Sequence, residues 1–167
     1  MEAISVMSKK VKLLTAGGMF AALIAVFTAY VSVPIAGGYF HPGDAMIALS
    51  AIVLGPYAAI PAAIGSALAD LLAGYTIYAP FTLVIKGLVG LAVGCGCKSG
   101  KLGLRSVCAL VLAALIIPVG YFVTDWVLYS LATAIASLPW NLLQALVCVI
   151  SGCVCMGTKL RKLIDRI

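Results

Sequence analysis

The chain has 167 residues and a formal net charge of +6, with 64% hydrophobic and only 10% charged side chains. Its mean hydropathy of +1.20 excludes a water-soluble globular domain and indicates an integral membrane protein. The basic residues gather in three short clusters, at 9–12, 98–105 and 159–166, and not in a continuous surface that would bind nucleic acid. Such clusters mark loops on the cytoplasmic side of a membrane, so we expect cytoplasmic termini and no nucleic acid partner.

The basic clusters also limit the number of membrane crossings, because the chain must cross an even number of times between two cytoplasmic loops. At about 17 to 25 residues per helix, the first interval fits four crossings and the second fits two. Turn signals fall where this count needs them, at Gly55-Pro56 and in 74–80. We therefore expect an all-α integral membrane protein with a single six-helix domain over residues 1–167 and an apolar outer segment near 126–138. The predicted helices cover 11–33, 43–56, 58–74, 79–97, 105–125 and 139–159.

Four charged residues interrupt these apolar helices: Asp44, Asp70, Lys86 and Asp125. A charge inside a membrane is costly and usually faces a cavity, a partner charge or a ligand. At 1.5 Å per helical residue, Asp70 and Lys86 lie about 6 to 9 Å deep on neighbouring helices, where they either pair with each other or bind a ligand. All four charges fall in the outer half of the protein, which predicts a site that opens outward.

Aromatic and polar side chains collect at the same level. The candidates for substrate binding, besides the four charges, are His41, Tyr75, Tyr78, Thr82, Trp126, Trp140, Asn141 and Gln144. Aromatic walls with a few polar groups suit a flat heterocyclic ligand. The alternatives are an interfacial aromatic belt for the tryptophans, helix–helix hydrogen bonds for the two amides, and a solvated loop for the histidine.

Small residues recur every four positions along the first predicted helix, at Gly17, Ala21, Ala25 and Ala29. Such a stripe allows close approach of another helix, which is either a partner protein or a neighbour in the same bundle. The six cysteines map mainly to inner helix ends, where reduced thiols are expected. Their spacing and the lack of a nearby histidine argue against a metal site, and no metal or cofactor is expected.

Several motifs resemble a known family. They are the runs GYFHPGDA at 38–45, LGPY at 54–57, GSALADLLAGY at 65–75 and IYAPFTLVIKGL at 77–88. Together they resemble the substrate-binding S component of energy-coupling factor (ECF) vitamin transporters. The resemblance is greatest to the branch of riboflavin, hydroxymethylpyrimidine and pyridoxine carriers. It is densest from 38 to 90 and covers most of the chain.

The resemblance implies a six-helix subunit, not an enzyme, in the cell membrane of a prokaryote. Such a subunit captures a vitamin at its outer face under a gate of loops. It then docks on a transmembrane T subunit driven by two cytoplasmic ATPases and topples within the membrane to release the vitamin inside. In the family, an Ala-x3-Ala stripe on the first helix serves docking, and Ala21 and Ala25 match it here, with Gly17 in place of an upstream alanine.

The residues themselves support a specific hypothesis for binding. Asp70, Lys86, Asn141 and Gln144 would hydrogen-bond a heteroaromatic ring and its hydroxymethyl groups. Three carboxylates against one lysine favour a neutral or weakly basic ligand, such as pyridoxine or hydroxymethylpyrimidine. Riboflavin or a queuosine-type compound would need a larger cavity.

Two other functional classes are alternatives to a binding subunit. An ion- or proton-coupled secondary transporter of a small polar solute would also use intramembrane charges, although the chain has no inverted repeat and is short for that class. A membrane enzyme is not supported by any nucleophilic or metal-binding set, since His41 is the single histidine.

Overall fold

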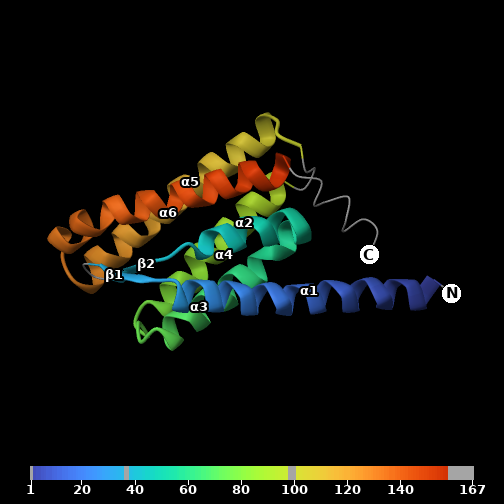
Figure 1. Cartoon of the computed structure of the whole chain (residues 1–167), viewed down its shortest axis with the longest axis horizontal. Coiled ribbons are helices and arrows are strands. Elements are labelled where there is room, and N and C mark those ends of the chain that lie inside the picture. Colours follow the sequence, from blue (N-terminus) through green and yellow to red (C-terminus); the bar gives the residue numbers. More distant parts are fainter. Residues whose placement is uncertain (1, 36–37, 98–100, 158–167) are drawn as a thin grey trace.

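Six α-helices and a short β-hairpin make up the described part of the chain, which covers residues 2–35, 38–97 and 101–157 of this computed structural model. The elements are α1 (Glu2–Tyr30), β1 (Val33–Ile35), β2 (Gly38–Phe40), α2 (Gly43–Leu54), the 3₁₀ turn η1 (Gly55–Ala58), α3 (Ala59–Leu72), α4 (Ala79–Cys97), α5 (Leu104–Leu128) and α6 (Leu131–Gly157). The helices run roughly along one long axis, with the hairpin and the α5–α6 turn at one end and the N-terminus at the other (Figure 1).

The helices have the length and composition of membrane spans. Five helical segments qualify within the described residues: Lys10–Tyr30, Gly43–Leu72, Ala79–Cys97, Leu104–Leu128 and Leu131–Met156. The expectation of an all-α membrane protein is therefore confirmed. The second of these segments contains both α2 and α3, which have 12 and 14 residues.

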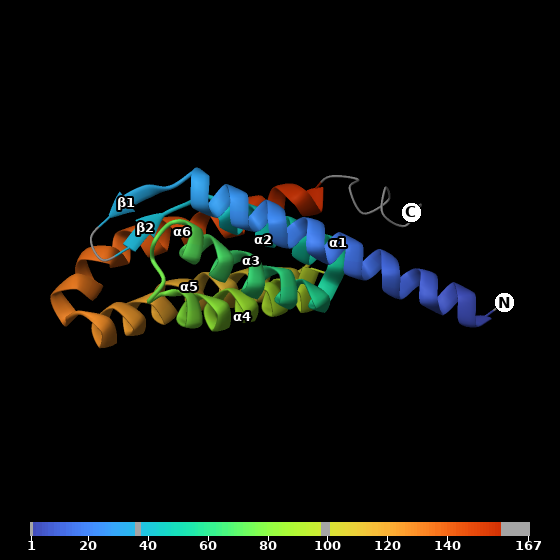
Figure 2. The ribbon, with the colours of Figure 1, turned by 90° about the horizontal axis from the view of Figure 1, so that it is seen from below.

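The chain reverses direction between α2 and α3, as Figures 1 and 2 show. The reversal occurs at η1, where Gly55 has a φ of 62° in the left-handed region that favours glycine. Pro56 follows at the start of the turn, where its missing N–H costs nothing. The predicted break at Gly55-Pro56 is confirmed, and it makes α2 and α3 two arms of a helical hairpin.

Helix α4 packs directly on this turn through glycines. A Cβ atom on Gly94 would lie 2.1 Å from the Gly55 carbonyl oxygen, and one on Gly90 would lie 2.8 Å from that of Ala58. Backbone-to-backbone contact of this kind is typical of membrane bundles, in which small residues let helices approach closely.

Replacing Gly94 by valine is expected to destabilise the protein by about 1–3 kcal/mol, because the new side chain displaces backbone atoms. The melting temperature in detergent measures this effect. Gly18→Ala is the matched control, since nothing lies within 4 Å of a Cβ atom there and alanine favours a helix. Equal melting temperatures for the Gly94 variant and wild type would contradict the close packing of α4 on η1.

Two parts of the fold differ from the expectation. The hairpin pairs Val33 with Phe40 and Ile35 with Gly38, and no strand was predicted there. The outer segment predicted at 126–138 is wrong, because α5 continues to Leu128 and α6 begins at Leu131. Pro139 is a residue favoured in a first turn, and its position predicts a later start for the last helix. The helix instead begins after Ser130, whose Oγ accepts a hydrogen bond from Thr133 N at 3.2 Å and acts as an N-cap.

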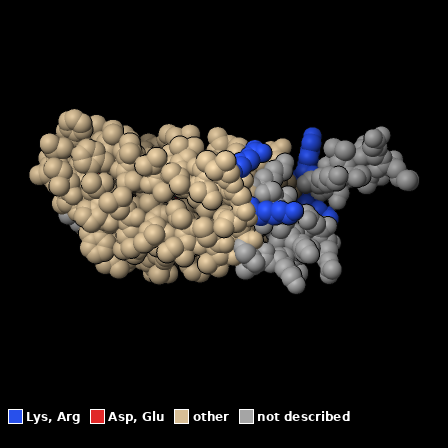
Figure 3. Space-filling model, turned by 90° about the horizontal axis from the view of Figure 1, so that it is seen from above, with Lys and Arg blue, Asp and Glu red and all other residues tan. Residues whose placement is uncertain are grey.

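Charge is distributed unequally along the bundle. The described and exposed basic residues Lys10, Lys12, Lys101 and Arg105 belong to the end that carries the N-terminus, and Figure 3 shows basic atoms at that end. The aspartates at 44, 70 and 125 are all buried, and no acidic atom of the described residues is visible on this face (Figure 3). This is the asymmetry that the positive-inside rule associates with a cytoplasmic end.

Candidate functional site

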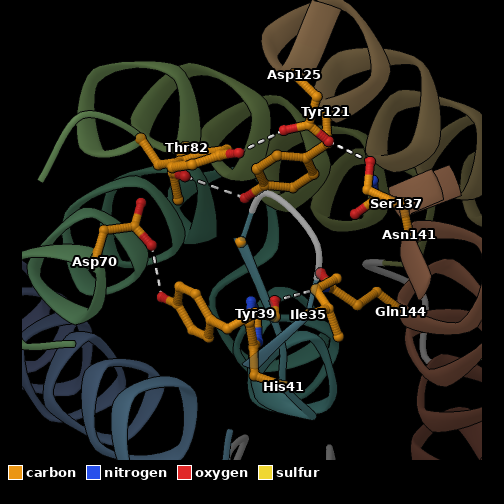
Figure 4. Close-up of a pocket in the computed structure, with 12 residues that line it drawn as sticks. Ile35, Tyr39, His41, Asp70, Thr82, Tyr121, Asp125, Ser137, Asn141 and Gln144 are labelled. Atoms are coloured by element: carbon orange, nitrogen blue, oxygen red, sulfur yellow. Dashed lines mark hydrogen bonds between the residues drawn. The ribbon is translucent and has the colours of Figure 1, made fainter. Parts of the chain in front are cut away.

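A small buried cavity lies at the end of the bundle that carries the hairpin (Figure 4). Its lining residues are Ile35, Gly38, Tyr39, His41, Asp70, Tyr78, Thr82, Tyr121, Asp125, Ser137, Asn141 and Gln144. The cavity offers about 30 Å³ to the centres of water molecules, which is room for about two waters. Side chains therefore nearly fill the cavity.

The structure brings many of the predicted site residues together here. Those that line the cavity are His41, Asp70, Tyr78, Thr82, Asp125, Asn141 and Gln144, and those that do not are Asp44, Tyr75, Lys86, Trp126 and Trp140. The lining residues that the prediction missed are Ile35, Gly38, Tyr39, Tyr121 and Ser137. Tyr121 had a usable signal, because it precedes Asp125 by four residues and so shares its helix face. Ser137 fell in the segment wrongly predicted as a loop.

Lys86 is fully buried and pairs with Asp44, not with Asp70. Its Nζ donates to both Asp44 carboxylate oxygens at 2.8 Å and to Gln144 Oε1 at 3.1 Å. A lysine ammonium has three N–H donors, so all three are in use. Of the two alternatives for Asp70 and Lys86, a pair with each other is not formed, and Lys86 instead joins α2, α4 and α6 beside the cavity.

Gln144 connects this ion pair to the cavity. Because the ammonium of Lys86 can only donate, it fixes the Gln144 oxygen toward itself and leaves the amide nitrogen to donate elsewhere. Gln144 Nε2 lies 3.4 Å from the Tyr39 carbonyl oxygen on β2. Asn141, one turn earlier on α6, is also buried and faces the cavity (Figure 4).

Two tyrosines hold the remaining carboxylates. Tyr39 OH donates to Asp70 Oδ1 at 2.5 Å, and Tyr78 OH donates to Asp125 Oδ1 at 2.6 Å. Ser137 Oγ donates to the other oxygen of Asp125. Burial and the neighbouring carboxylate raise the pKa of both Tyr39 and Tyr78, so the hydroxyls stay protonated and act as donors.

The tyrosines also form an aromatic cover. The rings of Tyr39 and Tyr75 are stacked with centroids 4.6 Å apart, and Tyr78 meets Tyr75 edge-on at 6.4 Å. This contact joins the hairpin to the turn between α3 and α4. Tyr75 therefore belongs to the cover although it does not line the cavity.

The tryptophans lie away from the cavity. Trp126 is 55% exposed, and Trp140 is 40% exposed with its ring 6.0 Å from that of Phe40. Exposed tryptophans near the end of a membrane bundle fit the alternative of an interfacial belt. A direct role in substrate binding would require them to move.

His41 is buried, which excludes the alternative of a solvated loop histidine. Its Nδ1 accepts a hydrogen bond from Gly43 N at 3.2 Å. Burial, and then the positive charge of Lys86, lower the pKa of His41 well below its ordinary value. The imidazole is thus neutral in the folded protein.

Acidification is expected to destabilise wild type more than a His41→Gln variant. The unfolded chain binds a proton at His41 below about pH 6.5, whereas the folded chain does not, so stability falls by up to about 1.4 kcal/mol per pH unit below that value. The melting temperatures of both proteins are measured between pH 7.5 and 5. Because the two proteins share the same carboxylates, the difference between their pH profiles reports the titration of His41. Parallel pH profiles would contradict a buried neutral histidine.

The small-residue stripe of α1 is partly used within the bundle. A Cβ atom on Gly65 would lie 2.6 Å from the Ala21 carbonyl oxygen, so Ala21 packs on α3, and Ala25 is buried. Ala29 is half-buried. Gly17 and Gly18 face open space and border an apolar groove of about 420 Å³ between α1 and the η1–α3 segment.

The cysteines are all free thiols. Within the described residues, no group of three or more His, Cys, Asp or Glu side chains is placed to hold a metal ion.

Apolar helices of membrane length around an internal pocket with aspartate, amide and tyrosine side chains define a membrane protein with a buried site. Residues 8–162 match the family described as ECF-type riboflavin transporter, S component, and the chain belongs to this family. It is therefore a transporter subunit and not an enzyme. It is also 37% identical over 123 residues to a protein of Pyrococcus woesei described as "Uncharacterized protein in gap 3'region", covering 73% of this chain and 82% of that protein.

Proposed function

We propose that this chain is the substrate-binding subunit of an ECF-type importer in the cell membrane of a prokaryote. It captures a small heteroaromatic vitamin or vitamin precursor in the cavity below the hairpin. The observation that supports this most is the cavity itself, which combines carboxylate, amide and tyrosine groups in an otherwise apolar bundle. Its position opposite the basic end supports six crossings with both termini in the cytoplasm.

Ligand entry requires the cover to open. Pockets for small organic ligands have volumes of about 300–1,000 Å³, roughly tenfold or more above the present 30 Å³. The parts of the cover that are not helical are the hairpin, which carries Tyr39, and the turn that carries Tyr78. Moving them outward breaks the Tyr39–Asp70 and Tyr78–Asp125 hydrogen bonds and exposes both carboxylates to a ligand.

The charges around the cavity favour a neutral or weakly basic ligand. Lys86 neutralises Asp44, which leaves Asp70 and Asp125 as acceptors for hydroxyl, amine or ring N–H groups. Pyridoxine and hydroxymethylpyrimidine carry such donors on a small ring. Riboflavin, which the family description names, and queuosine-type compounds need a wider opening.

The proposal is tested by uptake in proteoliposomes. With a T subunit and two ATPases added, the chain should support ATP-dependent uptake of riboflavin, pyridoxine or hydroxymethylpyrimidine. Uptake by the chain alone, driven by a proton gradient, would instead favour the ion-coupled secondary transporter.

The partner surface on α1 has its own test. We propose that the accessible part of the stripe, at Gly17 and the half-buried Ala29, docks on the T subunit, whereas Ala21 and Ala25 of the same stripe pack within the bundle. Gly17→Leu is expected to abolish co-purification with the T subunit while leaving ligand-induced thermal stabilisation intact, because Gly17 faces open space. Ala21 is a poorer choice, since its replacement also disturbs the contact with Gly65. Retained co-purification of the Gly17 variant would exclude this position from the interface.

A further inference from the structure

The three buried aspartates differ in how many of their oxygens are engaged. Lys86 donates to both oxygens of Asp44. Tyr78 and Ser137 donate to the two oxygens of Asp125. Asp70 accepts one hydrogen bond, from Tyr39 to Oδ1, and its Oδ2 is buried without a hydrogen-bond partner in the described structure. Asp70 is thus the aspartate with spare accepting capacity.

An unengaged oxygen on a buried carboxylate is unfavourable, because burial removes the water that would otherwise bind it. Asp70 is 3% exposed and lines the cavity. The neighbouring Thr82 hydroxyl interacts with the Asp70 carboxylate and also lies 3.2 Å from Tyr121 OH, but no donor meets hydrogen-bond geometry at Oδ2. The ammonium of Lys86 has no donor left for Asp70. Oδ2 therefore keeps accepting capacity for a donor in the cavity.

The orientation of this oxygen is fixed when the cover is closed. The short bond from Tyr39 holds Oδ1 on the hairpin side, which sets the carboxylate plane, and Figure 4 shows Oδ2 turned away from Tyr39. A preorganised acceptor discriminates strongly between ligands, because a ligand without a matching donor leaves the buried charge unpaired.

We propose that Asp70 is the specificity-determining residue of the site, and that its Oδ2 accepts a hydrogen bond from an O–H or N–H group of a neutral or cationic ligand. Ligands that present an anionic group or a bare acceptor at this position are rejected. This inference rests on the proposed function and narrows it, since it separates Asp70 from Asp44 and Asp125, whose oxygens are already engaged.

Affinity measurements on purified full-length protein test the inference. Riboflavin, pyridoxine and hydroxymethylpyrimidine are titrated into wild type, Asp70→Asn and Ser66→Ala by calorimetry. Ser66 is the matched control, because it lies one turn earlier on α3 and its buried hydroxyl also lacks a partner, but it does not line the cavity. The compound that binds wild type should bind Asp70→Asn about 10- to 100-fold more weakly and Ser66→Ala within about threefold.

A second comparison separates recognition from a structural effect. Analogues that each lack one donor, namely 3-methylriboflavin, 4-deoxypyridoxine and 4-amino-2,5-dimethylpyrimidine, are titrated beside their parent compounds. Loss of the donor that meets Asp70 should weaken binding to wild type at least tenfold but binding to Asp70→Asn less than threefold. Asp70→Ser, which also removes the carboxylate, replaces the asparagine variant if that protein does not fold.

The outcomes distinguish the two levels of the proposal. If none of the three parent compounds binds wild type, the proposed vitamin specificity fails and the inference falls with it. If a compound binds wild type and Asp70→Asn equally, or if donor removal has the same effect on both, the inference is overturned while the proposed function stands.

Discussion

A Lys86→Met variant is expected to lose about 3–5 kcal/mol of stability, because removing the ammonium leaves the Asp44 carboxylate buried without a counter-ion. At roughly 2–4 °C per kcal/mol for a chain of this size, the melting temperature in detergent should fall by about 10 °C. The loss should extend beyond the pair itself, since Gln144 also depends on Lys86 for its orientation.

The double variant Asp44→Leu, Lys86→Met supplies the control for this effect. Replacing a buried ion pair by apolar side chains is often neutral, so the double variant should regain most of the lost stability. Arg105→Met, at an exposed position, should change the melting temperature by no more than about 1–2 °C. A Lys86 variant as stable as wild type would mean that the Asp44–Lys86 pair is not formed in the folded protein.

Tyr39→Phe combined with Tyr78→Phe is expected to open the cover of the empty site. Each substitution removes a hydrogen bond to a carboxylate, worth about 1.5–3 kcal/mol, and opening lets water solvate the two aspartates. Amide hydrogen exchange at 33–35, 38–40 and 73–78 should accelerate by about 10- to 100-fold or more. Association of ligand should accelerate as well if opening limits its rate, because the open state becomes more populated.

Tyr57→Phe is the matched control for the cover. Tyr57 lies in η1, away from the cavity, and is 59% exposed, so its hydroxyl should not affect exchange in the hairpin. Unchanged exchange at 33–35 and 38–40 in the double variant would show that the tyrosine–carboxylate bonds do not hold the cover closed.

The helical part of the fold could be predicted because membrane spans depend on local composition. Apolar stretches, basic clusters and the Gly55-Pro56 break are all visible in the sequence. The hairpin was missed because its paired strands have three residues each, too few for an alternating pattern. Pro139 misled the prediction of α6, because a proline is acceptable inside a membrane helix whose neighbours satisfy the freed carbonyl.

Several residues that line the cavity could be predicted from the sequence, but their hydrogen-bond and ion-pair partners could not. A charged residue inside an apolar segment indicates a candidate site whatever the direction of its side chain, and this signal identified Asp70 and Asp125. Which aspartate pairs with Lys86 depends on how α2, α4 and α6 are arranged around it, and helical rise alone places Asp70 and Lys86 at similar depth without giving their directions. The tryptophans were overvalued because composition does not distinguish a ring that faces a cavity from one that faces lipid.

The central claim is that the cavity binds a small heteroaromatic compound with hydrogen-bond donors. Mass spectrometry of small molecules released from the detergent-purified protein tests it most directly, with Asp70→Asn as the comparison. We expect a vitamin-like compound in near-stoichiometric amount from wild type and a strongly reduced amount from the variant. A wild-type protein purified from vitamin-rich cells that releases no such compound, and that no vitamin stabilises against heat, would contradict it.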